Sequence, residues 1–184
     1  MKILAASDLH GDSIAAKKLA LLASKENVDL VILAGDITDF SHDSFDLIKP
    51  FKEIGKKVLI IPGNHESFST ADFLAEFYDV KNIHGYSVKY EDLGIFGCGG
   101  ANIGMEALSE DEIFKLFEKG FGKVQYLGKR IMVSHVFANN TLAEKLSHEL
   151  LPGSKGVRKL LKSLNLIFYY VAILMRLKVL KRKL

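Results

Sequence analysis

The chain has 184 residues, of which 48% are hydrophobic, and this is enough for one well-buried domain but short for two. Its single cysteine, Cys98, excludes a disulfide framework and a zinc site built from thiolates, and it suits a reducing compartment, so we expect a cytoplasmic protein. The net charge of +3 is uneven, because residues 1–154 carry 16 basic and 22 acidic side chains, whereas residues 155–184 carry nine basic ones and no acid. A basic end can bind nucleic acid or a membrane surface, but more often it is merely solvated.

The apolar run after Met1-Lys2 is too short for the core of a signal peptide.

The first predicted strand, Ile3–Ser7, leads directly into Asp8-Leu-His10-Gly11. In an extended segment, side chains two residues apart point to the same side, so the Asp8 carboxylate and the His10 imidazole could meet one metal ion. Gly11 permits a sharp turn, and Asp12 or Ser13 can cap a helix predicted over Ile14–Lys25. Taken alone, Asp-x-His is more typical of an ordinary turn than of a metal site.

The second predicted strand, Val31–Ala34, is a continuous apolar run, as expected for a buried parallel strand, and it stops at Gly35-Asp36. A buried carboxylate at the end of such a strand needs a partner, and a bound cation is a common one. The alternative is that Asp36 caps a turn or a helix. A short helix is predicted over Ser44–Ile54 with an apolar face, although Pro50 should break or kink it.

The third predicted strand, Lys57–Ile61, ends at Pro62-Gly63-Asn64-His65-Glu66. Three successive strands therefore deliver polar groups that can bind metal or phosphate to the same edge of the predicted sheet. Independent structural roles at all three ends would require a coincidence, so we interpret them as one site.

These motifs, Asp8-Leu-His10, Gly35-Asp36, Gly63-Asn64-His65-Glu66 and the later Ser134-His135, resemble the signature of the calcineurin-like metallophosphoesterases. The resemblance covers about residues 1–165 and is greatest to the small, single-domain bacterial and archaeal members. It implies an α/β fold, in which a mixed sheet or a two-sheet sandwich is flanked by helices and the site lies at strand ends.

The resemblance also implies two divalent metal ions (Mn, Fe or Zn) and hydrolysis of a phosphomonoester or phosphodiester. By this resemblance the metal ligands are Asp8, His10, Asp36, Asn64 and His135, with Asp36 bridging the two ions. His65 matches the catalytic histidine of the family, and Asp39 is a weaker prediction for a residue that orients it or a ligand. Nucleic acid enters this expectation only as a substrate, and no membrane span is expected.

The remaining segments carry no further chemistry. A helix is predicted over Ser69–Tyr78 with Phe73, Leu74 and Phe77 facing inward, and His84 is interpreted as a structural histidine. Further along the chain, a capping box starts a helix at Ser109. The other predicted elements are strands Tyr86–Tyr90, Leu93–Phe96 and Arg130–Ser134 and a basic helix from Pro152 to about Leu164.

The chain departs from the family after residue 165, because the last metal motif, Gly-His-x-His, is missing. The expected division is therefore an incomplete phosphoesterase domain over residues 1–165 and an apolar and basic tail over 166–184. Ten apolar residues are too few to span a bilayer, although the tail could lie in a membrane interface or bind a partner. Leu166–Leu174 is rich in β-branched and aromatic residues and could instead form the strand that normally precedes the motif. Without this motif, each metal ion would lose one ligand. The alternative to an active enzyme is therefore a catalytically impaired remnant of the family that keeps the fold and binds metal only partially.

We hypothesise that the tail results from a shift of reading frame near Asn165. If Tyr170 to Arg176 are encoded TAT GTG GCC ATA CTC ATG AGG, reading from the third base gives Cys-Gly-His-Thr-His-Glu, which contains the missing motif. In that case the basic character of the tail is no evidence for a nucleic-acid or membrane partner.

Overall fold

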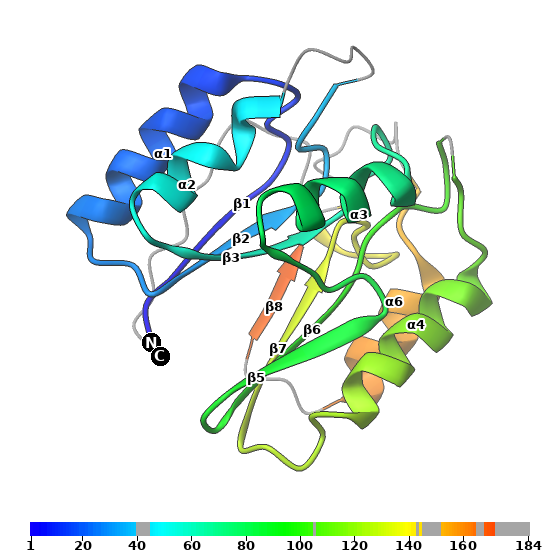
Figure 1. Ribbon diagram of the computed structural model, residues 1–184. Helices are drawn as coiled ribbons and strands as arrows, with labels where there is room; N and C mark the ends of the chain where they lie inside the picture. Colours follow the sequence, from blue (N-terminus) through cyan, green and yellow to red (C-terminus); the bar gives the residue numbers. More distant parts are fainter. Residues whose placement is uncertain (40–44, 105, 143, 145–151, 165–167, 172–184) are drawn as a thin grey trace.

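The protein consists of two four-stranded sheets that pack face to face, with helices on both outer faces (Figure 1). This computed structural model describes residues 1–39, 45–104, 106–142, 144, 152–164 and 168–171. The expected α/β sandwich flanked by helices is confirmed.

The first sheet is parallel throughout, and its strands follow one another in chain order. Because each right-handed connection returns to the neighbouring strand, all of its helices lie on the same face of the sheet. The opposite face is left for the second sheet. The strands are β1 (Ile3–Ala6), β2 (Leu30–Ala34), β3 (Lys57–Ile61) and β4 (Lys81–Asn82), and the helices are α1 (Ser13–Lys25), the 3-10 helix η1 (Phe45–Leu47), α2 (Lys49–Glu53) and α3 (Phe68–Phe77).

The second sheet is mixed, because its first strand runs antiparallel to the next and the other pairs are parallel. Two helices, α4 (Glu110–Gly122) and α6 (Lys155–Ser163), cover its outer face (Figure 1). The strands, in order across the sheet, are β5 (Tyr86–Tyr90), β6 (Leu93–Cys98), β7 (Lys129–Ser134) and β8 (Phe168–Val171). Strand β8 lies in the predicted tail, whose remaining residues are outside those described. Within the described ranges, no helix has the length and hydropathy needed to cross a membrane.

The continuous apolar runs of the first sheet are explained by burial on both faces. In β2, Val31 and Leu33 face the helical layer, whereas Leu30, Ile32 and Ala34 face the second sheet. The layer between the sheets also contains Leu59 from β3 and Ile95 and Ile131 from the second sheet. Burial on both faces is the reason that these strands show no alternation of apolar and polar residues.

Local sequence signals set the helix starts as expected. Asp12 caps α1, because one carboxylate oxygen accepts the backbone N–H groups of Ile14 (2.9 Å) and Ala15 (2.8 Å). The capping box at the start of α4 is also confirmed: the Ser109 hydroxyl accepts from the Glu112 N–H, and the Glu112 carboxylate accepts from the Ser109 N–H.

The helix predicted over Ser44–Ile54 is divided in two, and Ser44 itself lies outside the described residues. The 3-10 helix η1 ends at Leu47 and α2 begins at Lys49, with Pro50 in its first turn. Proline is tolerated there because the first N–H groups of a helix have no partner within it. Ile48 and Phe51 are buried, as their spacing predicts.

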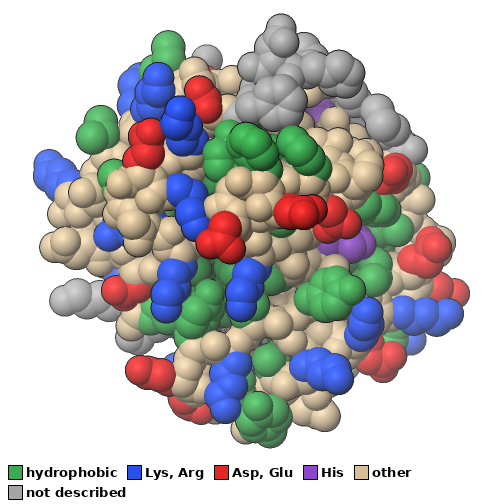
Figure 2. All heavy atoms as spheres, in the orientation of Figure 1, with side chains coloured by type: hydrophobic (Ala, Val, Ile, Leu, Met, Phe, Trp, Pro, Cys, Tyr) green, Lys and Arg blue, Asp and Glu red, His purple; other side chains and the backbone are tan. Residues whose placement is uncertain are grey.

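Of the three residues of α3 that were predicted to face inward, two do not. Leu74 is buried, but Phe73 and Phe77 are 48% and 63% exposed. The two rings are four residues apart and stack on each other with centroids 5.6 Å apart, so they cover part of each other's apolar surface. Figure 2 shows hydrophobic side chains at the surface near α3, among charged side chains of both signs.

The packing between the two sheets can be tested at Leu59, which is 1% exposed. We expect Leu59→Ala to lower the free energy of unfolding by about 2–5 kcal/mol, because it removes buried methyl groups and leaves a cavity. Leu21→Ala on α1 is the matched control, since Leu21 is 69% exposed and should change stability by only about 0.5 kcal/mol. Urea denaturation measures both, and equal losses would contradict the packing described here.

Candidate metal centre

The centre lies where β1, β2 and β3 end, and the loops that follow β1 and β2 run side by side. The N–H of Asp8 donates to the carbonyl of Gly35 (3.0 Å), and the N–H of His10 donates to the carbonyl of Asp36 (2.9 Å). Asp8, His10 and Asp36 all have positive φ angles, of 57°, 43° and 49°. Left-handed conformations of residues other than glycine are uncommon and often occur at functional sites.

The expectation that Asp8 and His10 lie on an extended segment is therefore wrong, although the two side chains do converge. His10 Nε2 lies 3.9 Å from Asp8 Oδ1. This approach results from two left-handed residues in a tight loop and not from the two-residue repeat of a strand.

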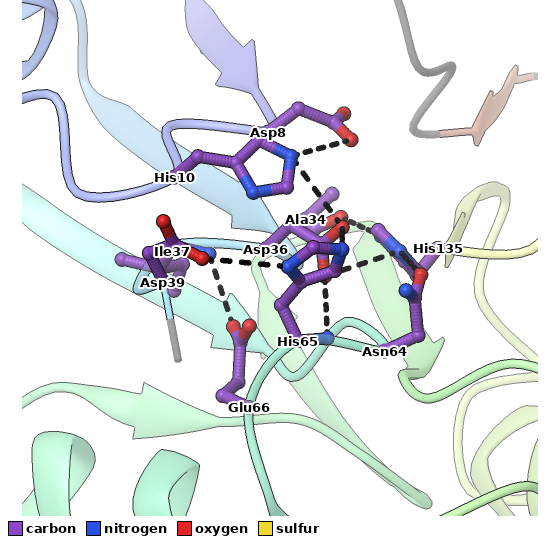
Figure 3. Close-up of polar contacts among 10 residues, drawn as sticks. All are labelled: Asp8, His10, Ala34, Asp36, Ile37, Asp39, Asn64, His65, Glu66 and His135. Carbon is purple, nitrogen blue, oxygen red and sulfur yellow. Dashed lines mark hydrogen bonds and ion pairs between the residues drawn. The ribbon is translucent and has the colours of Figure 1, made fainter. Parts of the chain in front are cut away.

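Asp36 is the middle of the centre (Figure 3), and its side chain is fully buried. Its Oδ1 accepts the backbone N–H of His65 (3.0 Å) and lies 3.5 Å from His135 Nε2. Its Oδ2 lies 3.7 Å from His10 Nε2 and 3.9 Å from His65 Nε2, and it accepts no hydrogen bond from any residue that the structure describes. The two oxygens of the carboxylate therefore face different groups of side chains: Oδ1 faces His135, and Oδ2 faces His10 and His65.

Two glycines allow this close approach. A Cβ atom on Gly63 would overlap Asp36 Oδ1, and a Cβ on Gly35, whose φ is +91°, would overlap the ring of His135. Glycine is therefore needed at both positions for steric reasons, and at Gly35 also for its backbone conformation.

His135 reaches the centre from the end of β7 in the other sheet and is 6% exposed. Its Nδ1 donates to the carbonyl of Ala34 (2.9 Å), and its Nε2 lies 3.0 Å from Asn64 Oδ1. A backbone carbonyl at Nδ1 fixes the orientation of the ring and directs Nε2 at the centre.

Burial and neighbouring charge act against each other on the ionisable groups. Burial would raise the pKa of Asp36, but the adjacent His135 and His65 outweigh it, so the pKa lies below its usual value. Burial would lower the pKa of His135, but Asp36 raises it to about 9. For Asp8, burial dominates and raises the pKa.

His65 lies between the Asp36 and Asp39 carboxylates. Its Nδ1 is 3.7 Å from Asp39 Oδ1, and its ring meets the His10 ring edge to face with centroids 4.5 Å apart. All of the residues predicted from the sequence are thus brought together at this edge of the first sheet (Figure 3): Asp8, His10, Asp36, Asp39, Asn64, His65 and His135.

Glu66 also belongs to the centre and was not predicted as a site residue. It is 4% exposed, and its Oε1 accepts the N–H of Ile37 (3.1 Å), which ties the loop after β3 to the loop after β2. The sequence did offer one indication that Glu66 belongs to the site, because it directly follows Asn64-His65. His84 is structural, as expected, because its Nδ1 accepts the N–H of Gly99 (3.1 Å) and its ring stacks on Phe68.

The residues present fit a divalent metal ion. Asp36 Oδ2 is a buried carboxylate oxygen that accepts no hydrogen bond within the described ranges, and one such atom is costly without a cation. One ligand atom each from His10, Asp36 and His65 lie within 4.8 Å of one another. Imidazole nitrogens together with carboxylate oxygens suit Mn, Fe and Zn.

Comparison with known proteins concerns the fold and the family of the chain. No curated protein matches the chain. Among solved structures, TT1561 of Thermus thermophilus is 19% identical with a TM-score of 0.74, over 92% of this chain and 80% of that one. A dimetal phosphatase from Danio rerio is 12% identical with a TM-score of 0.55, over 89% of this chain and 77% of that one. At these identities the likeness shows a shared fold. The family model of the calcineurin-like phosphoesterases matches residues 1–168, and the chain therefore belongs to this family.

Proposed function

We propose that this chain hydrolyses phosphomonoesters or phosphodiesters with the help of divalent metal ions bound at Asp36 and its neighbours. The observation that carries the proposal is the buried Asp36 carboxylate, which has side chains able to bind metal on both sides. Membership of a phosphoesterase family gives the reaction class.

The two oxygens of Asp36 support two adjacent metal positions. Asp8 and His10 lie on the side of Oδ2, and Asn64 and His135 lie on the side of Oδ1. Asp36 would bridge the two ions, as the resemblance implies. To bind an ion, His135 must release its Nε2 proton, while its Nδ1–H stays on the Ala34 carbonyl. Oxygen ligands from carboxylates and an amide favour Mn or Fe at these positions.

When bound, two such ions about 3.5–4 Å apart polarise phosphoryl oxygens and lower the pKa of a bound water. His65 is the proposed catalytic residue. Its side chain is about a quarter exposed and lies beside Asp36, so it can reach a phosphate ester and supply a proton to the leaving group. Asp39, at its Nδ1, orients the ring for this role.

The alternative is a catalytically impaired remnant of the family. The sequence contains no histidine after His148, so each ion would lack the ligand that the Gly-His-x-His motif normally provides. Even the loss of an outer hydrogen-bond partner of a metal ligand costs about 10- to 100-fold in affinity or activity. The fold is kept in this alternative, while metal binding is partial.

Strand β8 indicates where the missing motif would lie if the reading frame were shifted. It pairs in parallel with β7, and Val171 lies beside Ser134, the residue before His135. A Gly-His-x-His sequence that directly followed this strand would therefore begin at the edge of the sheet from which His135 enters the centre.

Glu66 holds the loops of the centre in place without needing to be a ligand. Burial raises its pKa to about 7, despite the N–H of Ile37 at its carboxylate. In the unfolded chain a glutamate has a pKa of about 4.3, so between these values the folded state holds a proton that the unfolded state has released. Stability should therefore fall as pH rises from about 4.5 to 7.

We expect the wild-type chain to hydrolyse bis(p-nitrophenyl) phosphate or p-nitrophenyl phosphate when Mn²⁺ is added, and Asp36→Asn to lower kcat/KM at least about 100-fold. The amide keeps the shape of the side chain but lacks its charge. Steady-state assays measure the effect, and Asp111→Asn in the exposed first turn of α4 is the matched control. Full activity of Asp36→Asn would place the chemistry elsewhere, and an inactive wild type with near-zero metal content would favour the remnant.

We expect Glu66→Gln to be more stable than the wild type at pH 8 by up to about 3 kcal/mol, and equal to it near pH 4.5. The neutral amide can still accept from Ile37 and never becomes charged. Denaturant titrations of metal-free protein across this pH range measure the difference. The exposed Glu118→Gln should follow the wild type at every pH. A constant difference between Glu66→Gln and the wild type would contradict the assigned pKa.

Sequencing the gene through the codons for Asn165 to Met175 tests the tail hypothesis. We expect another frame of these codons to spell Gly-His-x-His. Codons that cannot encode this motif in either alternative frame would end the hypothesis.

A further inference from the structure

Asp36 divides the centre into two unequal halves. On the side of Oδ1 the polar atoms already have partners, because Oδ1 accepts from the His65 N–H and His135 Nε2 contacts Asn64 Oδ1 at 3.0 Å. On the side of Oδ2, two imidazole nitrogens face a buried oxygen that has no hydrogen-bond donor among the described residues. A bound cation would therefore stabilise the Oδ2 side more than the Oδ1 side, because it would compensate the buried oxygen that lacks a hydrogen bond from the described residues.

The spacing on that side matches the coordination of a single ion. Two ligands that are each about 2.0–2.2 Å from one metal ion are separated from each other by roughly 3–4 Å. Asp36 Oδ2 is 3.7 Å from His10 Nε2 and 3.9 Å from His65 Nε2, and the three ligand atoms lie within 4.8 Å of one another. Shifts of a few tenths of an ångström would bring all three to bonding distance.

His65 also has the surroundings of a metal-bound histidine. Its Nδ1 is next to the Asp39 carboxylate, and a carboxylate at one ring nitrogen is the usual arrangement that directs the other nitrogen to a metal ion. Its backbone N–H is fixed on Asp36 Oδ1, so the carboxylate that faces its ring also holds its main chain (Figure 3).

We propose that the phosphate-free protein binds one divalent ion through His10, Asp36 and His65, with Asp8 beside them. This inference rests on the proposed function, because it concerns the same centre, but it makes His65 a metal ligand in a chain that lacks the last two histidines of the family. With a phosphate ester bound, one of its oxygens would take the place of the His65 nitrogen as a ligand, so that the His65 ring would be available for its proposed catalytic role.

The test measures metal binding and not turnover. The full-length chain is freed of metal with EDTA and titrated with Mn²⁺ in phosphate-free buffer, and bound metal is determined by equilibrium dialysis. We expect about one ion per chain, and His65→Ala to weaken its affinity at least about tenfold, as should His10→Ala. His84→Ala, which removes a histidine outside the centre, is the matched control and should bind like the wild type.

Circular dichroism shows whether each variant is folded, and the absorption spectrum of bound Co²⁺ gives a second measurement that depends on the ligand set. If His65→Ala binds Mn²⁺ as tightly as the wild type and its Co²⁺ spectrum is unchanged, His65 is not a ligand and the proposal is overturned. Two ions per chain in phosphate-free buffer, or none, would overturn it as well. Metal binding that depends on His65 without hydrolysis of either nitrophenyl ester would instead contradict the proposed function and leave the ligand assignment intact.

Discussion

The centre depends on the burial of one charged group, the Asp36 carboxylate. An ionised carboxylate is costly to bury unless positive charge and hydrogen-bond donors surround it. Here His135 and the His65 N–H provide part of this compensation and keep the pKa below its usual value, but only one of the two oxygens accepts a hydrogen bond from the described residues. Gly63 has no side chain because this carboxylate occupies the space that a Cβ would need. The motif residues are therefore constrained by one another as well as by the chemistry.

The fold supplies this group of side chains through its strand order. Sequential parallel strands bring the ends of β1, β2 and β3 to one edge, and their helices cover one face only. The free face packs on the second sheet through Leu59 and its neighbours, and this packing brings His135 to within 3.5 Å of a carboxylate 99 positions earlier in the sequence. The core between the sheets thus sets the geometry of the centre.

Much of this arrangement could be predicted from the sequence, because strands buried on both faces are continuous apolar runs, and each of the first three predicted runs ends in side chains that can bind metal. The family and the fold were predicted correctly from Asp8, His10, Asp36, Asn64, His65 and His135, whereas the role of each residue stays a prediction. The left-handed conformations of Asp8 and His10 could not be predicted, since they depend on hydrogen bonds to the neighbouring loop. The exposure of Phe73 and Phe77 was missed because an apolar residue on a short helix can be covered by its own neighbour.

The hydrogen bond from His135 to Ala34 joins the two halves of the sandwich, because its donor belongs to one sheet and its acceptor to the other. In the two-ion state of the proposed function, an ion held by Asp36 and His135 would add a second link across the same boundary. Since a ligand that binds only the folded state adds to its stability, the availability of metal would govern how often the halves separate and how quickly a protease can cut the chain. For such a protein, metal scarcity would reduce abundance as well as activity.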